Sequence, residues 1–173
     1  MTNNALAFTA LCNEYCAAIE HAAATEQPDF VANMLRLLPR IYISAFDLAD
    51  EGALDDGYIE QRLDEDTYDS LRTSLQALLG ENDTYLEVFE EDMKYSDSPI
   101  GASLSEGLAD LFQEFYNYLE TVRDATDDVV KSALVAVKED FGMFWAATLC
   151  NVLRPLNSIH FSNERVSRPR GFP

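Results

Sequence analysis

The sequence predicts an all-α protein: an antiparallel bundle of about six helices followed by an extended basic C-terminal tail. Three observations lead to this fold class. Only 7 of the 173 residues are Gly and 6 are Pro, while Ala, Leu, Glu and Asp dominate, a composition that favours helices. Apolar residues recur at spacings of three and four along most of the chain. Ser or Thr followed three residues later by Glu, a signature of helix N-termini, precedes apolar runs.

The N-terminal third predicts two helices. The first spans about residues 4–24 and the second about residues 28–49, whose opening proline can begin a helix but cannot continue one. The second contains "MLRLLPRIYISAF", the most apolar run of the chain, which nevertheless carries Arg36 and Arg40 on one helix face. Pro39 lies between them and cannot donate a backbone hydrogen bond, so we expect the helix to bend there.

The middle of the chain changes in character. Residues 50–66 combine Asp and Glu with two glycines and predict a loop, and a helix over 65–79 follows. Thr84 and Glu87 then form a capping box ahead of apolar residues, which predicts a short helix ending near Tyr95. We therefore expect no strand in the chain.

The C-terminal part predicts two longer helices and a tail. A capping box at Ser103 opens a helix that ends near residue 124, and a last helix spans about residues 127–153. Residues 154–173 contain four Arg and one Glu, and their end lacks helical spacing and is rich in proline. We expect one helical domain over residues 1–153 and an extended tail over residues 154–173.

Charge is the main guide to the class of partner. The chain has 12 Lys and Arg against 31 Asp and Glu, a net charge of −19. Such a charge argues against binding to nucleic acid or to an anionic membrane surface, and it favours a basic protein partner. Residues 47–97 form an acidic belt with 17 acids and 3 basic residues. The charges expected at a partner interface are Glu87, Glu90 and Glu91 in the belt and Arg165, Arg168 and Arg170 in the tail. Counterions, or the basic tail itself, are the alternative neutralisers of the belt.

No complete catalytic or metal-binding motif is present. Glu87 and Glu90 supply one E-x-x-E half of a magnesium site, but no matching E-x-x-D follows, and no E-x-x-H pair exists for a di-iron site. Cys12 and Cys16 are one turn apart on an apolar helix face, where small core residues are the favoured interpretation. We therefore expect no metal, no cofactor and no catalytic residue, and a non-enzymatic role is favoured.

The arginine pair allows two interpretations. Arg36 and Arg40, together with Tyr42 and aromatic residues such as Trp145, are candidates for holding a small anionic ligand at the expected bend. Alternatively the two arginines pair with carboxylates of a neighbouring helix, for instance Glu14.

The cellular setting expected from the sequence is the cytoplasm. Three cysteines do not form a disulfide framework, and the acidic N-terminus does not resemble a signal peptide. No run of about 18 apolar residues is present, so no membrane-spanning helix is expected.

Two stretches also resemble a known family. "FTALCNEYCAAIE" and "FVANMLRLLPRIYISAFDL", and within the latter "LRLLPRIYISA" above all, are similar to a family of small all-helical bacterial proteins of unknown function, common in Bacteroides-like bacteria. The resemblance implies an all-α fold and a bacterial cytoplasmic protein, and it implies no activity or site residue. The favoured function is a non-catalytic interaction module that binds a basic partner through the acidic belt. The alternative is an anionic-ligand domain or enzyme around Arg36 and Arg40.

Overall fold

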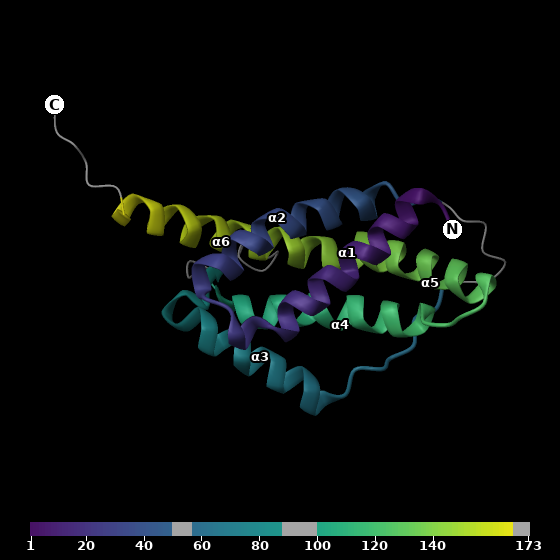
Figure 1. Cartoon of the computed structure of the whole chain (residues 1–173), viewed down its shortest axis with the longest axis horizontal. Coiled ribbons are helices and arrows are strands. Elements are labelled where there is room, and N and C mark those ends of the chain that lie inside the picture. The colour runs from purple at the N-terminus through teal and green to yellow at the C-terminus, as the bar shows by residue number, and fades with distance from the viewer. Residues whose placement is uncertain (50–56, 88–99, 168–173) are drawn as a thin grey trace.

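The computed structural model describes residues 1–49, 57–87 and 100–167, with side chains up to residue 162. It confirms an all-α bundle (Figure 1). The six long helices are α1 (Asn3–Glu20), α2 (Gln27–Phe46), α3 (Glu65–Leu79), α4 (Leu104–Val122), α5 (Asp127–Asp140) and α6 (Ala146–Ser167). Short 3₁₀ turns η1 (Ala22–Ala24) and η2 (Gly80–Asn82) follow α1 and α3, and a π-helical segment η4 (Phe141–Trp145) joins α5 to α6.

Helix α4 is the central element of the bundle. It packs against α1, α3, α5 and α6, while α2 covers α1 and α6. The C-terminal end of α6 extends beyond the other helices (Figure 1). The two helices that matter most below, α2 and α6, are therefore neighbours although they lie at opposite ends of the sequence.

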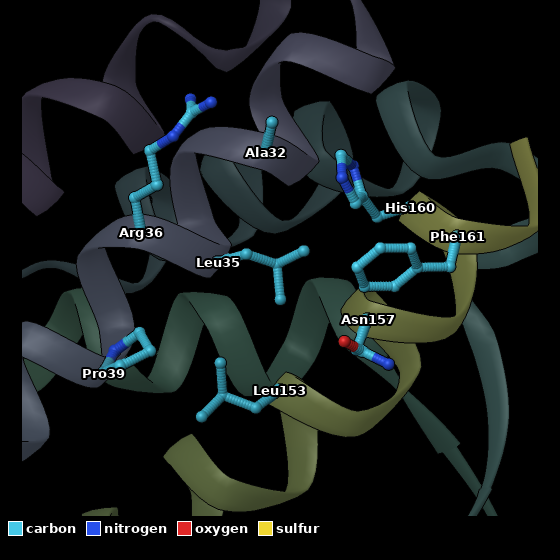
Figure 2. Close-up of a pocket in the computed structure, with 8 residues that line it drawn as sticks. All are labelled: Ala32, Leu35, Arg36, Pro39, Leu153, Asn157, His160 and Phe161. Carbon is cyan, nitrogen blue, oxygen red and sulfur yellow. The ribbon is translucent and has the colours of Figure 1, made fainter. Parts of the chain in front are cut away.

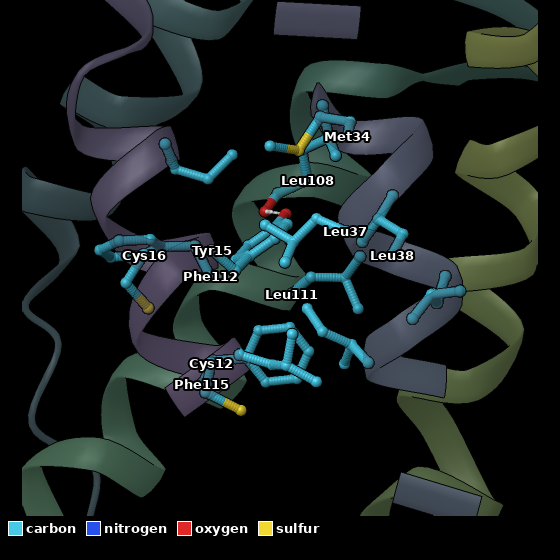
Figure 3. Close-up of a cluster of buried hydrophobic side chains, with 14 of the residues drawn as sticks. Cys12, Tyr15, Cys16, Met34, Leu37, Leu38, Leu108, Leu111, Phe112 and Phe115 are labelled. Carbon is cyan, nitrogen blue, oxygen red and sulfur yellow. Dashed lines mark hydrogen bonds between the residues drawn. The ribbon is translucent and has the colours of Figure 1, made fainter. Parts of the chain in front are cut away.

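The interior contains many aromatic side chains and the two N-terminal cysteines. Trp145 is buried against Phe8 and Phe115, and its indole Nε1 donates to the Val137 carbonyl at 3.1 Å. Tyr15 donates its hydroxyl to the Leu108 carbonyl at 2.8 Å within the cluster shown in Figure 3. Each buried polar group thus has a partner, which keeps the cost of its desolvation small.

Cys12 and Cys16 lie in that same core, as the favoured interpretation of their spacing predicted (Figure 3). Burial raises the pKa of both thiols well above the ordinary value, so they stay neutral and are poor nucleophiles and poor metal ligands. Among the residues that the structure describes, no group of three or more His, Cys, Asp or Glu is arranged to hold a metal ion.

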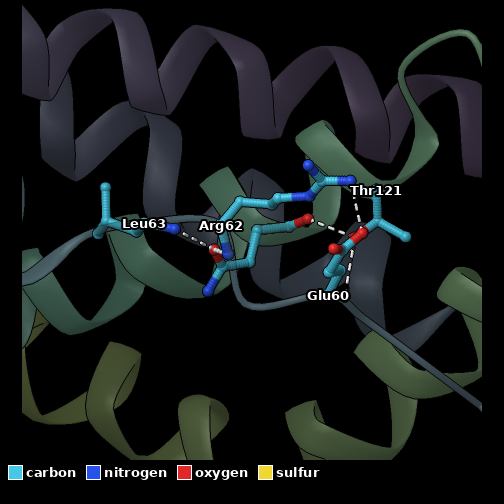
Figure 4. A network of polar contacts seen from close by, with 5 residues as sticks. Glu60, Arg62, Leu63 and Thr121 are labelled. Carbon is cyan, nitrogen blue, oxygen red and sulfur yellow. Dashed lines mark hydrogen bonds and ion pairs between the residues drawn. The ribbon is translucent and has the colours of Figure 1, made fainter.

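The extended segment before α3 is fixed to α4 by side chains of that helix. The carboxamide oxygen of buried Asn117 accepts from the backbone N–H groups of Arg62 and Leu63 at 2.8 and 2.9 Å, and Thr121 accepts from that of Glu60 at 3.0 Å (Figure 4). Further upstream, Gly57 lies so close to α5 that a Cβ at this position would approach the Ala136 backbone nitrogen to 2.4 Å. The segment follows a fixed course because backbone donors that no helix satisfies find partners on α4.

The helix expected from Thr84 was wrong, and so was the expectation that the chain contains no strand. Strand β1 (Thr84–Glu87) pairs antiparallel with β2 (Ile100–Ser103), with Thr84 opposite Ser103 and Glu87 opposite Ile100. The physical reason lies in the preceding residue. The buried Asp83 carboxylate accepts from the Ser105 backbone N–H at 2.7 Å and from the Ser103 hydroxyl at 3.0 Å. These bonds tie the start of β1 to the start of α4 and commit Thr84 to the pairing. The remainder of the expected helix lies outside the described residues.

The capping box at Ser103 is confirmed as the start of α4. The Ser103 hydroxyl accepts from the Glu106 backbone N–H at 3.3 Å, and α4 begins at the next residue.

The expected extended conformation from Arg154 onward was also wrong as far as Ser167, because α6 continues to that residue. The apolar stripe explains the continuation. Leu149, Val152, Leu156 and Ile159 are all buried, so the spacing of three and four residues crosses the expected boundary without interruption. Pro155 lies inside the helix and does not end it. The division into residues 1–153 and 154–173 stays a prediction, although one helix runs across it.

Candidate ligand-binding groove

A groove of about 460 Å³ lies between α2 and α6 (Figure 2). Each helix contributes one stripe of residues at helical spacing. The groove is lined by Ala32, Leu35, Arg36 and Pro39 of α2 and by Leu153, Asn157, His160 and Phe161 of α6. Its volume is within the range of about 300–1,000 Å³ usual for small-molecule sites.

The groove exists because short side chains lie at facing positions of two packed helices. Ala32 carries only a methyl group, and the Pro39 ring is folded back onto its own backbone. Leu35 and Leu153 are partly buried against the core and form the apolar floor. Phe161, 46% exposed, forms a wall at the C-terminal side. The result is an apolar recess that opens at the protein surface.

The polar groups of the groove are gathered along its edge. In Figure 2 the Arg36 guanidinium and the His160 ring lie on the same side of Leu35 with Ala32 between them, and Leu153 and Pro39 lie on the other side. Arg36 is exposed and forms no ion pair with any of the residues that the structure describes. An apolar floor beside an unpaired cation is suited to a molecule that is itself apolar at one end and negatively charged at the other.

The face formed by α2 and α6 also differs in charge from the rest of the protein. None of the 31 acidic residues occurs between Asp29 and Asp47 or between Asp140 and Glu164. The same two stretches contain Arg36, Arg40 and Arg154, all exposed. The negative charge of the chain is therefore segregated away from the groove, and an anion that reaches it meets no carboxylate on either lining helix.

The four residues expected to bind an anionic ligand are placed in different environments. Only Arg36 lines the groove. Arg40 pairs with Glu14 at 3.8 Å in an exposed contact, as the internal-pairing alternative expected for this residue. Tyr42 packs edge-on against Phe141, with ring centroids 5.1 Å apart, and Trp145 is only 2% exposed in the core. The proposed set is thus not assembled as one site, and Arg36 is its only member in the groove.

The expected partner interface stays a prediction. Glu87 is 7% exposed, and its carboxylate accepts from the Tyr85 hydroxyl at 3.2 Å, so it is not a surface charge. Glu90, Glu91, Arg168 and Arg170 lie outside the described residues, and Arg165 belongs to α6 without a described side chain.

Sequence reasoning missed the α6 half of the groove. Leu153, Asn157, His160 and Phe161 fell at or beyond the boundary placed before an extended tail. Their spacing of four, three and one is that of one helix face, and this was the signal available in the sequence.

A second, smaller cavity of about 190 Å³ lies between α4 and the π-helical segment. It is lined by Asp110, Glu114, Phe144, Trp145 and Thr148, with Leu111 and Gln113. Burial, with a contribution from the negative charges of Asp140 and Asp110, raises the pKa of Glu114 to about 7. Burial also raises the pKa of Asp140. This region therefore holds a carboxyl group that changes charge near neutral pH.

The comparisons with known proteins bear on both the fold and the origin of the chain. The model of a domain of unknown function, DUF5063, matches residues 1–162. The chain belongs to this family. A solved crystal structure, that of protein BF1032 from Bacteroides fragilis, is similar with a TM-score of 0.79 at 28% identity, covering 91% of this chain and 92% of the other. No curated protein matches the chain.

The family membership confirms the resemblance drawn from the N-terminal stretches, including its link to Bacteroides. Neither the family nor the solved member carries a stated activity, so function must be argued from the geometry. Within the described residues of this DUF5063 protein, no helix is long and apolar enough to cross a membrane.

Proposed function

We propose that this DUF5063 protein is a non-catalytic binding protein, and that the α2–α6 groove holds a small molecule with an apolar body and one negatively charged group. One observation carries the proposal. Arg36 borders an apolar recess without an ion-pair partner among the described residues, on a face whose helices carry no acid between Asp29 and Asp47 or between Asp140 and Glu164. This develops the second of the two hypotheses from the sequence and replaces its residue set with the groove lining.

The net charge of −19 does not prevent anion binding at this face. At physiological ionic strength the Debye length is about 8 Å, so acids further from the groove are largely screened. An unpaired arginine at the edge of a low-dielectric recess then has the greater local effect.

The hypothesis of a basic partner on the acidic belt has weaker support, since buried Glu87 is the one member of its acidic set that the structure describes. The two hypotheses differ in a measurable way. Binding to the belt would weaken with salt and would not respond to a change at Arg36, whereas binding in the groove would respond to that change.

The test uses 8-anilinonaphthalene-1-sulfonate, an apolar fluorophore with one anionic group, titrated into the full chain. We expect saturable binding that weakens by about tenfold in Arg36→Gln, the scale of a lost charge-assisted hydrogen bond. Ala32→Phe, which fills the recess and leaves Arg36 in place, should abolish the saturable signal. Arg154→Gln is the matched control, because it removes an exposed arginine of the same face that does not line the groove.

Binding that is equal in all four proteins would refute the proposed function. Circular dichroism melting curves of each variant would show whether the fold is retained. We further propose that the protein acts in the cytoplasm, which is supported by three cysteines that form no disulfide.

A further inference from the structure

We infer that the ligand of the α2–α6 groove is an alkyl monocarboxylate, that is, an aliphatic chain ending in one carboxylate. This inference rests on the proposed function and names the chemical class of its ligand. It follows from the number of charges, the kind of apolar wall and the scarcity of polar groups in the groove.

The charge available for the ligand is that of one guanidinium group. Arg36 is the only arginine among the lining residues, and no lysine lines the groove. Arg40 is paired with Glu14 at 3.8 Å. The guanidinium fork matches a carboxylate with two parallel hydrogen bonds, so one arginine suits one carboxylate. A phosphate dianion or a nucleotide would bring more charge than this lining can compensate.

The walls are aliphatic. Leu35, Leu153, Pro39 and Ala32 supply most of the apolar surface. Phe161 is the single aromatic ring of the lining, and Figure 2 shows no second ring opposite it except the imidazole of His160 on the adjoining residue. The two rings are in edge contact with each other, with centroids 4.9 Å apart, rather than spaced to sandwich a flat aromatic ligand. A flexible alkyl chain fits such walls better than a planar ring system does.

The polar lining side chains are few. Arg36, Asn157 and His160 are the only ones, and they border the apolar floor rather than interrupt it. A sugar or another polyhydroxylated molecule would bury several hydroxyl groups against leucine and proline without partners, which is costly. The arrangement instead orients an amphipathic chain, with its carboxylate at Arg36 and its alkyl part across Leu35 toward Leu153.

The test measures binding of decanoate to the full chain by isothermal titration calorimetry below its micelle concentration. Decyltrimethylammonium, decyl phosphate and 1-naphthoate are the comparison ligands: two keep the chain and change the head group, and the third keeps the carboxylate and changes the body. We expect decanoate to bind at least about tenfold more tightly than each of them. We also expect its affinity to fall about tenfold in Arg36→Gln and to be unchanged in Arg154→Gln.

The outcomes separate this inference from the proposed function. If the anilinonaphthalene sulfonate probe binds in an Arg36-dependent way but decanoate does not, or if 1-naphthoate or decyl phosphate binds more tightly, the ligand class is wrong and the groove remains a binding site. If neither the probe nor decanoate responds to Arg36→Gln and Ala32→Phe, both proposals are overturned.

Discussion

Replacing Glu114 by Gln is expected to stabilise the protein at alkaline pH and to have little effect at acidic pH. Glu114 lies on α4 beside the second cavity, where burial and the charges of Asp140 and Asp110 raise its pKa from 4.5 to about 7. A carboxyl group with a raised folded-state pKa is a cost to the fold only when it is ionised. Glutamine keeps the shape of the side chain and removes that charge.

The sign follows from the numbers of bound protons. Between pH 4.5 and about 7 the folded chain holds the Glu114 proton more tightly than the unfolded chain does. The contribution of Glu114 to the free energy of unfolding is therefore fully present below pH 4.5, falls as the pH rises through this window, and is lost above pH 7. The raised pKa of Asp140 acts in the same direction.

The magnitude can be bounded. The full shift corresponds to about 3 kcal/mol, and because Glu114 is only partly buried, solvent screening reduces it to about 1–2 kcal/mol. We expect Glu114→Gln to raise the free energy of unfolding by that amount at pH 8 and by less than about 0.5 kcal/mol at pH 4.5.

The assay is urea unfolding followed by circular dichroism at both pH values, with Glu139→Gln, an exposed position on α5, as the matched control. The reasoning would be refuted by a Glu114→Gln variant whose stability difference from the unchanged protein is the same at both pH values, or by a destabilised variant at pH 8.

Three further substitutions test the fold. Asn117→Ala removes the acceptor of two backbone N–H groups and should lower the free energy of unfolding by about 2–3 kcal/mol, measured in urea; a loss below about 0.5 kcal/mol would contradict the role given to the carboxamide. Gly57→Ala forces a methyl group against the α5 backbone and should lower the melting temperature, whereas Gly142→Ala, with open space around its Cβ, should not; equal melting temperatures would argue against the close approach. Arg40→Ala should cost less than about 1 kcal/mol, because its pair with a glutamate on α1 is exposed, and a loss near 3 kcal/mol would indicate a buried pair instead.

The parts of the fold that could be predicted are those decided by neighbours in the sequence. The cap at Ser103 and the apolar stripe of α4 depend on residues within one or two helical turns, and both appear where expected. Thr84 begins a strand despite an equally good capping pattern, because Asp83 bonds to Ser103 and Ser105, about 20 residues further along the chain. Such a partner is invisible to local pattern reading.

The groove was half predictable for a related reason. Arg36 stood out in the sequence as an unexplained charge on an apolar helix, and it does line the groove. Its partner stripe from Leu153 to Phe161 has the spacing of a helix face, but the prolines and arginines of that region favoured a tail. Which helix faces α2 depends on packing between segments more than 100 residues apart, and periodicity carries no information on it.

The segregation of acids away from α2 and α6 makes the molecule an electric dipole as well as a polyanion. A net charge decides whether a small anion is repelled at long range, whereas a dipole decides which way the protein turns as the two approach. An approaching anion therefore exerts a torque that rotates the α2–α6 face toward it, so that encounters on this side of the protein are more frequent than its exposed area alone would give. Added salt weakens this orientation and the overall repulsion together, and the association rate of an anionic ligand should accordingly depend on ionic strength less steeply than a charge of −19 placed at the centre of the protein would require.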